Sequence, residues 1–437
     1  MALLSATADP SSLLVSPTLQ RLSNGLTIIA EQMPLDAVNL SLWLRVGSAV
    51  ESDAINGMAH FLEHMIFKGT ADLPCGEFER RIEERGAVTN AATSQDYTKY
   101  DITTAPQDFR TLAPLQMQMV LNPRLSETDF ERERPVILEE IRRAEDNPRR
   151  RTYARSMEIT FERLPYRRSV LGPAAVIETL ALDHMRAFHS TWYQPQSITA
   201  VAVGNLPVEE LIATVAEGVE QATAQRPRFR TPSIDQFRPL LDYDMEPPFP
   251  TVQRVIHTDP TLTQARLTLI WRVPGMVDVE DTYALDILAS VLGRGRTSRL
   301  VSDLREDRKL VSSIGCSNMT LGYQGAFMVS ANLNPDHLDT VEQAIIDHIQ
   351  AAMDTPVSPA ELRRVQTQVA NRFIFANEAP SDRAGLYGFY HTLTGNITDG
   401  LHYPSHIQRL TEADVQHAAQ AFLSAQAYGV SIIRPGS

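Results

Sequence analysis

The chain has 437 residues, of which 43% are hydrophobic and 21% charged, so it is long enough for more than one buried core and too apolar for extensive disorder. Its net charge of −13 argues against a nucleic-acid-binding protein, which usually presents a basic face. A run of about 18 apolar residues, as in a transmembrane helix, does not occur, and the N-terminus lacks the pattern of a signal peptide, so we expect a cytoplasmic protein without a membrane partner.

The first part of the chain alternates between strand and helix patterns. Strands are predicted from period-two alternation and flanking turn signals, and helices from a 3.6-residue period. The predicted strands cover residues 26–30, 39–47, 88–91, 96–104 and 198–204. The predicted helices cover residues 57–68, 76–85, 108–121, 127–145 and 208–222. Because apolar and polar residues alternate in 39–47, we expect that strand to be half-buried.

A proline-rich stretch separates this part from a second part of similar plan. Residues 225–250 contain six prolines and are predicted to form an interdomain linker. The later predicted strands are 265–273, 310–314, 321–332 and 428–433, and the later predicted helices are 281–292, 298–306, 336–353 and 359–376. We therefore predict an α+β protein of two tandem homologous halves, residues 1–224 and 251–437, each a mostly antiparallel sheet with helices packed on one face.

One predicted helix carries a pattern typical of metal sites. His60 and His64 are four residues apart, so their rings project from the same helix face and are close enough to bind one ion. Glu63 lies on nearly the same face, in the order of an inverted His-x-x-Glu-His motif. Paired helical histidines are often only surface or core residues. Here the rest of the helix is apolar, and three ionisable side chains on a buried helix are costly unless they share a cation.

A catalytic zinc ion needs a third protein ligand and an open fourth position. The acidic helix predicted at residues 127–145 offers carboxylate candidates. Glu133 and Glu140 are separated by two helical turns and share a face, whereas Glu139 is expected to point elsewhere.

The motif and the acidic helix resemble the pitrilysin and mitochondrial-processing-peptidase family of zinc peptidases. In that family a glutamate about 76 residues past the second histidine completes the ligand set, and a further glutamate lies seven residues before it. Glu140 and Glu133 stand at these positions. The resemblance implies one Zn²⁺ per chain, bound by His60, His64 and Glu140, with Glu63 as the catalytic base and Glu133 as a second catalytic group.

The resemblance also extends to substrate-binding segments. Asn90 and Ala91 match the family positions that contact the peptide backbone, although Asn90 taken alone is typical of a turn. In the second half, relatives carry an arginine and, seven residues later, a tyrosine that hold the substrate carbonyl. Arg305 is present here, but Ser312 replaces the tyrosine, and the second half has no His-x-x-Glu-His motif.

These features predict a zinc-dependent endopeptidase that hydrolyses peptides or unfolded segments. The missing tyrosine favours a catalytic subunit of a dimer, either a homodimer or a heterodimer with a metal-less subunit that carries the Arg/Tyr pair. The chain acting alone with weaker oxyanion support is the other reading. A non-catalytic scaffold or assembly subunit of the same family is the alternative function.

Two further features receive no functional role. Cys75 and Cys316, far apart in sequence, are typical of reduced thiols in a cytosolic protein. The arginine-rich stretch 142–151 has no interleaved aromatic residues, so we expect a solvated helix end rather than a nucleic-acid-binding segment.

Overall fold

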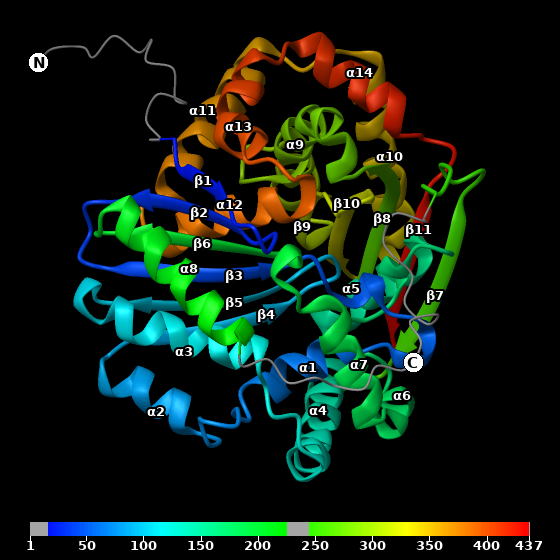
Figure 1. The fold of residues 1–437 in the computed structure, drawn as a ribbon. Helices are drawn as coiled ribbons and strands as arrows, with labels where there is room; N and C mark the ends of the chain where they lie inside the picture. Colours follow the sequence, from blue (N-terminus) through cyan, green and yellow to red (C-terminus); the bar gives the residue numbers. More distant parts are fainter. Residues whose placement is uncertain (1–15, 225–243, 437) are drawn as a thin grey trace, which may run out of the picture.

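The computed structural model describes residues 16–224 and 244–436 (Figure 1). Most of the predicted linker, residues 225–243, lies outside the described residues, as do residues 1–15 and 437. On either side of the linker, the described residues form one sheet with its own helices. No helix among the described residues is long and apolar enough to cross a lipid bilayer.

The first sheet has six strands in the order β1-β2-β6-β3-β5-β4. Its strands are β1 (Thr18–Arg21), β2 (Thr27–Gln32), β3 (Val38–Leu44), β4 (Val88–Thr93), β5 (Thr98–Thr104) and β6 (Ile198–Gly204). Every neighbouring pair is antiparallel except β2 and β6. The expectation of a half-buried strand at 39–47 is wrong, because every residue of β3 is buried. Two of its polar side chains are hydrogen-bonded to each other: the Ser41 hydroxyl donates to Asn39 Oδ1 at 2.7 Å.

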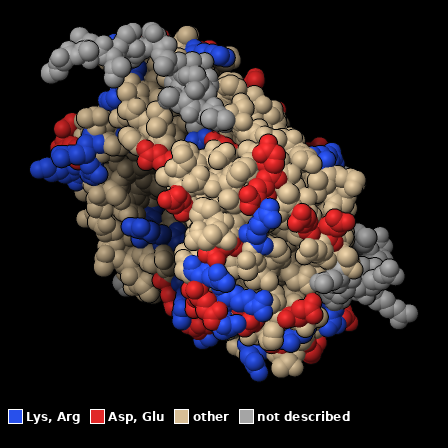
Figure 2. Space-filling view, turned by 60° about the vertical axis from the view of Figure 1, so that its left-hand side comes forward, with Lys and Arg blue, Asp and Glu red and all other residues tan. Residues whose placement is uncertain are grey.

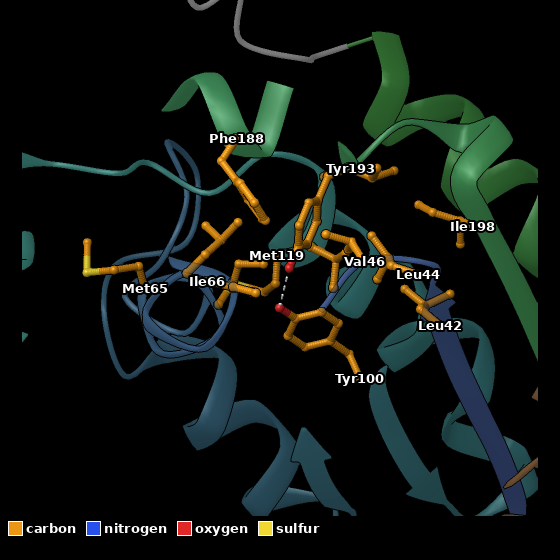
Figure 3. Close-up of a cluster of buried hydrophobic side chains, with 14 of the residues drawn as sticks. Leu42, Leu44, Val46, Met65, Ile66, Tyr100, Met119, Phe188, Tyr193 and Ile198 are labelled. Carbon is orange, nitrogen blue, oxygen red and sulfur yellow. Dashed lines mark hydrogen bonds between the residues drawn. The ribbon is translucent and has the colours of Figure 1, made fainter. Parts of the chain in front are cut away.

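The helices of the first half follow the predicted order and add three that the sequence did not indicate, α5 to α7. They are α1 (Met58–Ile66), α2 (Glu77–Glu84), α3 (Phe109–Leu121), α4 (Glu127–Asp146), α5 (Pro148–Thr160), α6 (Ala174–Thr179), α7 (Leu182–Trp192) and α8 (Val208–Ala224). Figure 3 shows part of the core of the first half, where Met65 and Ile66 of α1 lie among residues of the strands and Phe188 of α7. In this core the Tyr100 and Tyr193 hydroxyls are 3.0 Å apart.

The second sheet repeats the strand order of the first, without a counterpart of β1. Its order is β7-β11-β8-β10-β9, with β7 and β11 as the one parallel pair. The strands are β7 (Gln253–Asp259), β8 (Ala265–Pro274), β9 (Val311–Met319), β10 (Gln324–Leu333) and β11 (Gly429–Pro435). The helices are α9 (Val279–Gly293), the π-helical turn η9 (Val301–Asp307), α10 (Leu338–Asp354), α11 (Pro359–Phe375), α12 (Pro380–Thr394), α13 (Thr398–Arg409) and α14 (Glu412–Phe422). The predicted α+β plan of two similar halves is confirmed.

Each sheet also receives one helix from the other half on the face that its own core helices leave open. Helix α12 packs on β3 and β6 of the first sheet, and α5 packs on β8 and β11 of the second. The indole of Trp43 and the phenol of Tyr387 lie in a small core between β3 and α12. The two helices occupy corresponding places in the two halves, so the exchange is reciprocal. This exchange explains why β3 is buried on both faces.

Buried carboxylates connect the halves at several points. Glu31 of β2 accepts hydrogen bonds from Arg383 at 3.0 Å and Tyr387 at 2.7 Å, both on α12. Asp96 accepts the backbone N–H of Gly322 at 2.8 Å. On the face shown in Figure 2, acidic and basic side chains are interspersed, and Lys or Arg side chains lie in the hollow at its left.

Candidate metal centre

The start of helix α1 is fixed by a buried carboxylate. Glu51 accepts the backbone N–H of Ala59 at 2.7 Å, the backbone N–H of Gly57 at 2.8 Å and the side-chain amide of Asn56 at 2.8 Å. These contacts satisfy first-turn donors that a helix leaves unpaired. Burial raises the pKa of Glu51 to about 7. Gly57 has φ of 99° and a Cβ there would lie 2.6 Å from Leu171 O, so only glycine fits at this entry.

Helix α1 and helix α4 bring three ligand atoms together. The Nε2 atoms of His60 and His64 lie 3.5 and 3.6 Å from Oε2 of Glu140. These distances are too long for hydrogen bonds and close to the ~3.3 Å that separates two ligands on a tetrahedral zinc ion with bonds of about 2.0–2.1 Å. The three side chains are 9%, 24% and 35% exposed, so the group is enclosed on one side and open on the other.

Glu133 fixes the orientation and tautomer of His64. Its Oε1 lies 3.0 Å from His64 Nδ1, and its Oε2 lies 2.6 Å from the Lys68 ammonium. Burial acts to raise the pKa of Glu133, but the hydrogen bonds from His64 and Lys68 hold it below its usual value. An ionised carboxylate only accepts hydrogen bonds, so the proton of His64 is on Nδ1. Nε2 therefore turns a bare lone pair towards the Glu140 carboxylate.

The donor set fits a zinc ion. Two acceptors, the lone pair of His64 and the oxygen of Glu140, face each other without a proton between them, which is unfavourable unless a cation lies between. Burial is the main cause that lowers the pKa of His60 to about 3, so His60 is in the neutral form that binds metals. Two imidazoles, one carboxylate and an open side match a catalytic zinc site.

Glu63 lies beside this group and is not part of it. Its Oε2 accepts the Thr93 hydroxyl at 2.5 Å, which ties α1 to the end of β4. Burial is the largest influence on Glu63 and raises the pKa of its carboxyl. A carboxylate of raised pKa next to a metal group is suited to accept a proton.

The neighbour of Glu140 in sequence points away from the site, as expected. Glu139 forms ion pairs with Arg142 at 2.7 Å and Arg143 at 3.2 Å. Of the two adjacent carboxylates on α4, only Glu140 reaches the histidines.

Asn90 and Ala91 lie in β4, the outermost strand of the first sheet, rather than in a turn. Asn90 pairs with Asp101 and Ala91 with Tyr100 of β5. Within the part of the chain that the structure describes, no strand pairs with the other edge of β4. The strand ends at Thr93, which holds Glu63, so a peptide added to this edge would run towards the metal group.

Arg305 and Ser312 are not brought to the metal group. Arg305 lies on η9 and pairs with Glu306 at 2.6 Å. Ser312 lies on β9, where its hydroxyl donates to Gln264 Oε1 at 2.7 Å. Among the contacts of the described residues, none joins either side chain to His60 or His64.

The second half repeats the Glu63 arrangement without the histidines. Asp286 of α9 is half-buried and accepts hydrogen bonds from Asn318 of β9 at 2.9 Å and from Tyr403 at 2.9 Å. Strand β9 is the outermost strand of its sheet, as β4 is in the first. In both halves a half-buried acid on the first core helix is therefore bound by the edge strand. Across the described residues, a possible metal-binding group occurs in the first half alone.

Sequence reasoning missed Lys68, Thr93 and Arg150. Lys68 follows His64 by four residues on the line of α1, and that spacing is a signal that could have identified it. Thr93 and Arg150 reach the site through the packing of β4 and α5, for which the sequence spacing carries no signal.

Comparison with known proteins places the chain in a peptidase family. The model described as insulinase (peptidase family M16) matches residues 27–174, which contain the whole candidate metal centre. The model described as peptidase M16 inactive domain matches residues 179–369. The chain belongs to this M16 family of peptidases, as its resemblance to the pitrilysin group predicted.

Several relatives are zinc proteases by name. The zinc protease PqqE of Helicobacter pylori is 28% identical over 387 residues, covering 87% of this chain and 84% of its own length. An uncharacterized zinc protease of Mycobacterium tuberculosis is 27% identical over 429 residues, covering 98% of this chain and 95% of its own length.

Solved structures share the fold. A protease from Helicobacter pylori has a TM-score of 0.87 at 24% identity and covers 96% of this chain and 99% of its own. A Pseudomonas fluorescens protein described as a peptidase M16 inactive domain has a TM-score of 0.84 at 19% identity. It covers 97% of this chain and 98% of its own. At these identities the two structures establish the fold alone.

Proposed function

We propose that this chain is a zinc-dependent endopeptidase that hydrolyses peptides or unfolded segments. The observation that carries the proposal is the convergence of His60, His64 and Glu140 within 4.8 Å, with Glu63 beside them. Zinc held by these three residues would lower the pKa of a water molecule towards about 7 and polarise a substrate carbonyl.

Four other residues of the chain would act on the water, the histidine ring and the peptide. Glu63 takes the proton of the attacking water and passes it to the leaving nitrogen, and burial raises its pKa towards the range that suits both transfers. Glu133 orients His64 through the Nδ1–H bond. Asn90 and Ala91 align the peptide as an additional strand on β4.

The clamp on the substrate carbonyl is incomplete in this chain, because Ser312 replaces the expected tyrosine. We propose that the chain works as the catalytic subunit of a dimer. Its partner is either a second copy or a metal-less subunit that supplies an arginine and a tyrosine. The description of a structural neighbour as an inactive domain keeps a non-catalytic scaffold as the second candidate. Against this candidate stands the complete set of His60, Glu63, His64 and Glu140.

The test compares wild type with Glu63→Gln, each loaded with zinc. We expect both proteins to bind one zinc ion and only wild type to cleave an unstructured peptide, with a loss of about 100-fold or more in the variant. Removal of the metal with a chelator should abolish cleavage, and added zinc should restore it. A wild type that binds zinc but cleaves nothing, alone or with a partner that carries the Arg/Tyr pair, would favour the scaffold.

A further inference from the structure

A hollow opens beside the metal group between helices α4 and α5. It has a volume of 720 Å³, and Glu140 forms part of its wall. Val136 and Pro135 contribute its apolar wall, and Arg143 and Arg150 contribute the basic side chains. A peptide bound with its scissile bond at Glu140 would therefore place a neighbouring side chain here.

The hollow is lined by two acidic and two basic side chains, and Arg150 is the basic one outside their ion pairs. Arg143 is paired with Glu139, and Oε2 of Glu140 faces the histidines. Arg150 is exposed, and among the described residues its guanidinium has no acidic partner within ion-pair distance. Its neighbour on α5, Arg151, is already neutralised by Asp259 of the second half.

Arg150 is held in place at the backbone. Asn147 caps α5, and its Oδ1 accepts the backbone N–H of Arg149 at 2.9 Å and of Arg150 at 3.3 Å. The helix that follows packs on β8 and β11 of the second sheet. The backbone of Arg150 is therefore fixed beside the hollow, and its guanidinium is free to bind a ligand.

Arg150 lies next to the metal group, because Arg150 and the ligand Glu140 line the same hollow. A substrate residue next to the scissile bond would enter this hollow, where the guanidinium of Arg150 could contact it.

We infer that Arg150 is a specificity-determining residue that binds an acidic side chain of the peptide, next to the bond to be cut. This inference rests on the proposed peptidase function and adds the substrate class. A guanidinium binds a carboxylate with two parallel N–H bonds, which neutral side chains do not reproduce. Arg150 is exposed, as predicted for a solvated helix end at residues 142–151, and the inference adds a ligand-binding role for it.

Binding to a zinc-loaded Glu63→Gln protein tests the inference without depending on catalysis. The probes are fluorescent unstructured peptides in which one glutamate is moved stepwise along an otherwise neutral sequence, each with a glutamine twin. Fluorescence anisotropy gives the dissociation constants. At one position of the glutamate, we expect that peptide to bind about tenfold more tightly than its glutamine twin. The difference should shrink at high salt.

Substitution at position 150 should then remove the preference. We expect Arg150→Gln to bring the two dissociation constants together and Arg150→Glu to favour a lysine peptide instead. Arg149→Gln is the matched control, because it removes the same charge from the same helix without touching the hollow, and the tenfold preference should remain. Equal binding of the twins at every register, or a preference that survives Arg150→Gln, overturns the inference. Failure of wild type to cleave any peptide counts against the proposed function instead, and leaves the binding result to decide the role of Arg150.

Discussion

Glu63 and Glu133 both lie beside the histidine pair, and their surroundings shift their pKa values in opposite directions. Burial dominates at Glu63 and raises the pKa of its carboxyl. At Glu133 the hydrogen bonds from His64 and Lys68 outweigh burial and lower the pKa. The first carboxylate is therefore suited to exchange protons, and the second to stay ionised and hold a ring in place.

Replacement of Glu133 by glutamine should weaken zinc binding. The amide retains an acceptor for His64 but loses the negative charge and the ion pair with Lys68. We expect an affinity about 10- to 100-fold lower, measured by competition with a chromogenic chelator. Glu139→Gln is the control, since Glu139 lies on the same helix and faces away from the histidines. Equal affinities of wild type and Glu133→Gln would show that His64 does not need this partner.

Glu51 should make the stability of the fold depend on pH. Burial raises its pKa from 4.5 to about 7, so the folded protein keeps this proton while the unfolded chain has released it. The protonated Glu51 side chain contributes fully to the free energy of unfolding below pH 4.5. This contribution declines by about 3 kcal/mol as the pH rises to 7.

The Glu51 effect is isolated by comparing wild type with Glu51→Gln in metal-free protein. The variant has no group to titrate at this position, so the wild-type free energy of unfolding should fall relative to that of the variant between pH 4.5 and 7. Urea unfolding at several pH values measures both. Two parallel curves would contradict the role assigned to burial.

The ligand set could be predicted from sequence because spacing along two helices determines it. His60 and His64 share a face of α1 by their four-residue separation, and Glu133 and Glu140 share a face of α4 by their seven-residue separation. Arg150 could not be predicted, because its position depends on how α5 leaves α4 at Asn147. An arginine-rich helix start has no periodicity that distinguishes a ligand-binding residue from a solvated one.

At the scale of elements, the exchange of α5 and α12 is the feature that the local sequence does not encode. Period-two alternation in 39–47 predicted one exposed face for β3. The structure covers that face with α12, which lies more than 300 residues later in the chain. Alternation reports the polarity of a strand, whereas its burial is decided by elements far away in sequence.

Close packing of α12 on the sheet predicts opposite effects for two glycines of one helix. A Cβ on Gly388 would lie 2.1 Å from the indole nitrogen of Trp43, so Gly388→Ala should push the helix off β3 and cost about 1–3 kcal/mol of unfolding free energy. A Cβ on Gly385 meets nothing within 4 Å, so Gly385→Ala should stabilise the protein by about 0.5–1 kcal/mol through helix propensity. Urea unfolding of both variants measures the effects. Destabilisation by the two alanines alike would mean that contact with Trp43 is not the cause.

At the scale of the whole molecule, the two halves are joined through buried charges as well as through apolar contacts. Glu246 accepts the backbone N–H groups of Glu162, Arg163 and Leu164, at 2.9, 2.7 and 2.8 Å. It also pairs with Arg272 of β8 at 3.0 Å, and both side chains are almost fully buried. The segment after α5 in the first half is thereby fixed to the second sheet, which keeps α5 and Arg150 in register with the metal group on α1 and α4.

Removal of Glu246 should be among the most damaging single changes in the protein. Glu246→Ala leaves the Arg272 charge and three backbone donors buried without their acceptor, and we expect a loss of about 3–5 kcal/mol in the free energy of unfolding, measured by urea unfolding. Asp183→Ala is the control: it breaks the Asp183–Arg186 pair of α7, in which Asp183 is 80% exposed, and should cost less than about 1 kcal/mol. Arg272→Met should cost less when Glu246 is already alanine, because the two residues share one network and their effects do not add. If the losses in unfolding free energy from Glu246→Ala and Arg272→Met simply add in the double variant, the halves are held together by contacts other than this pair.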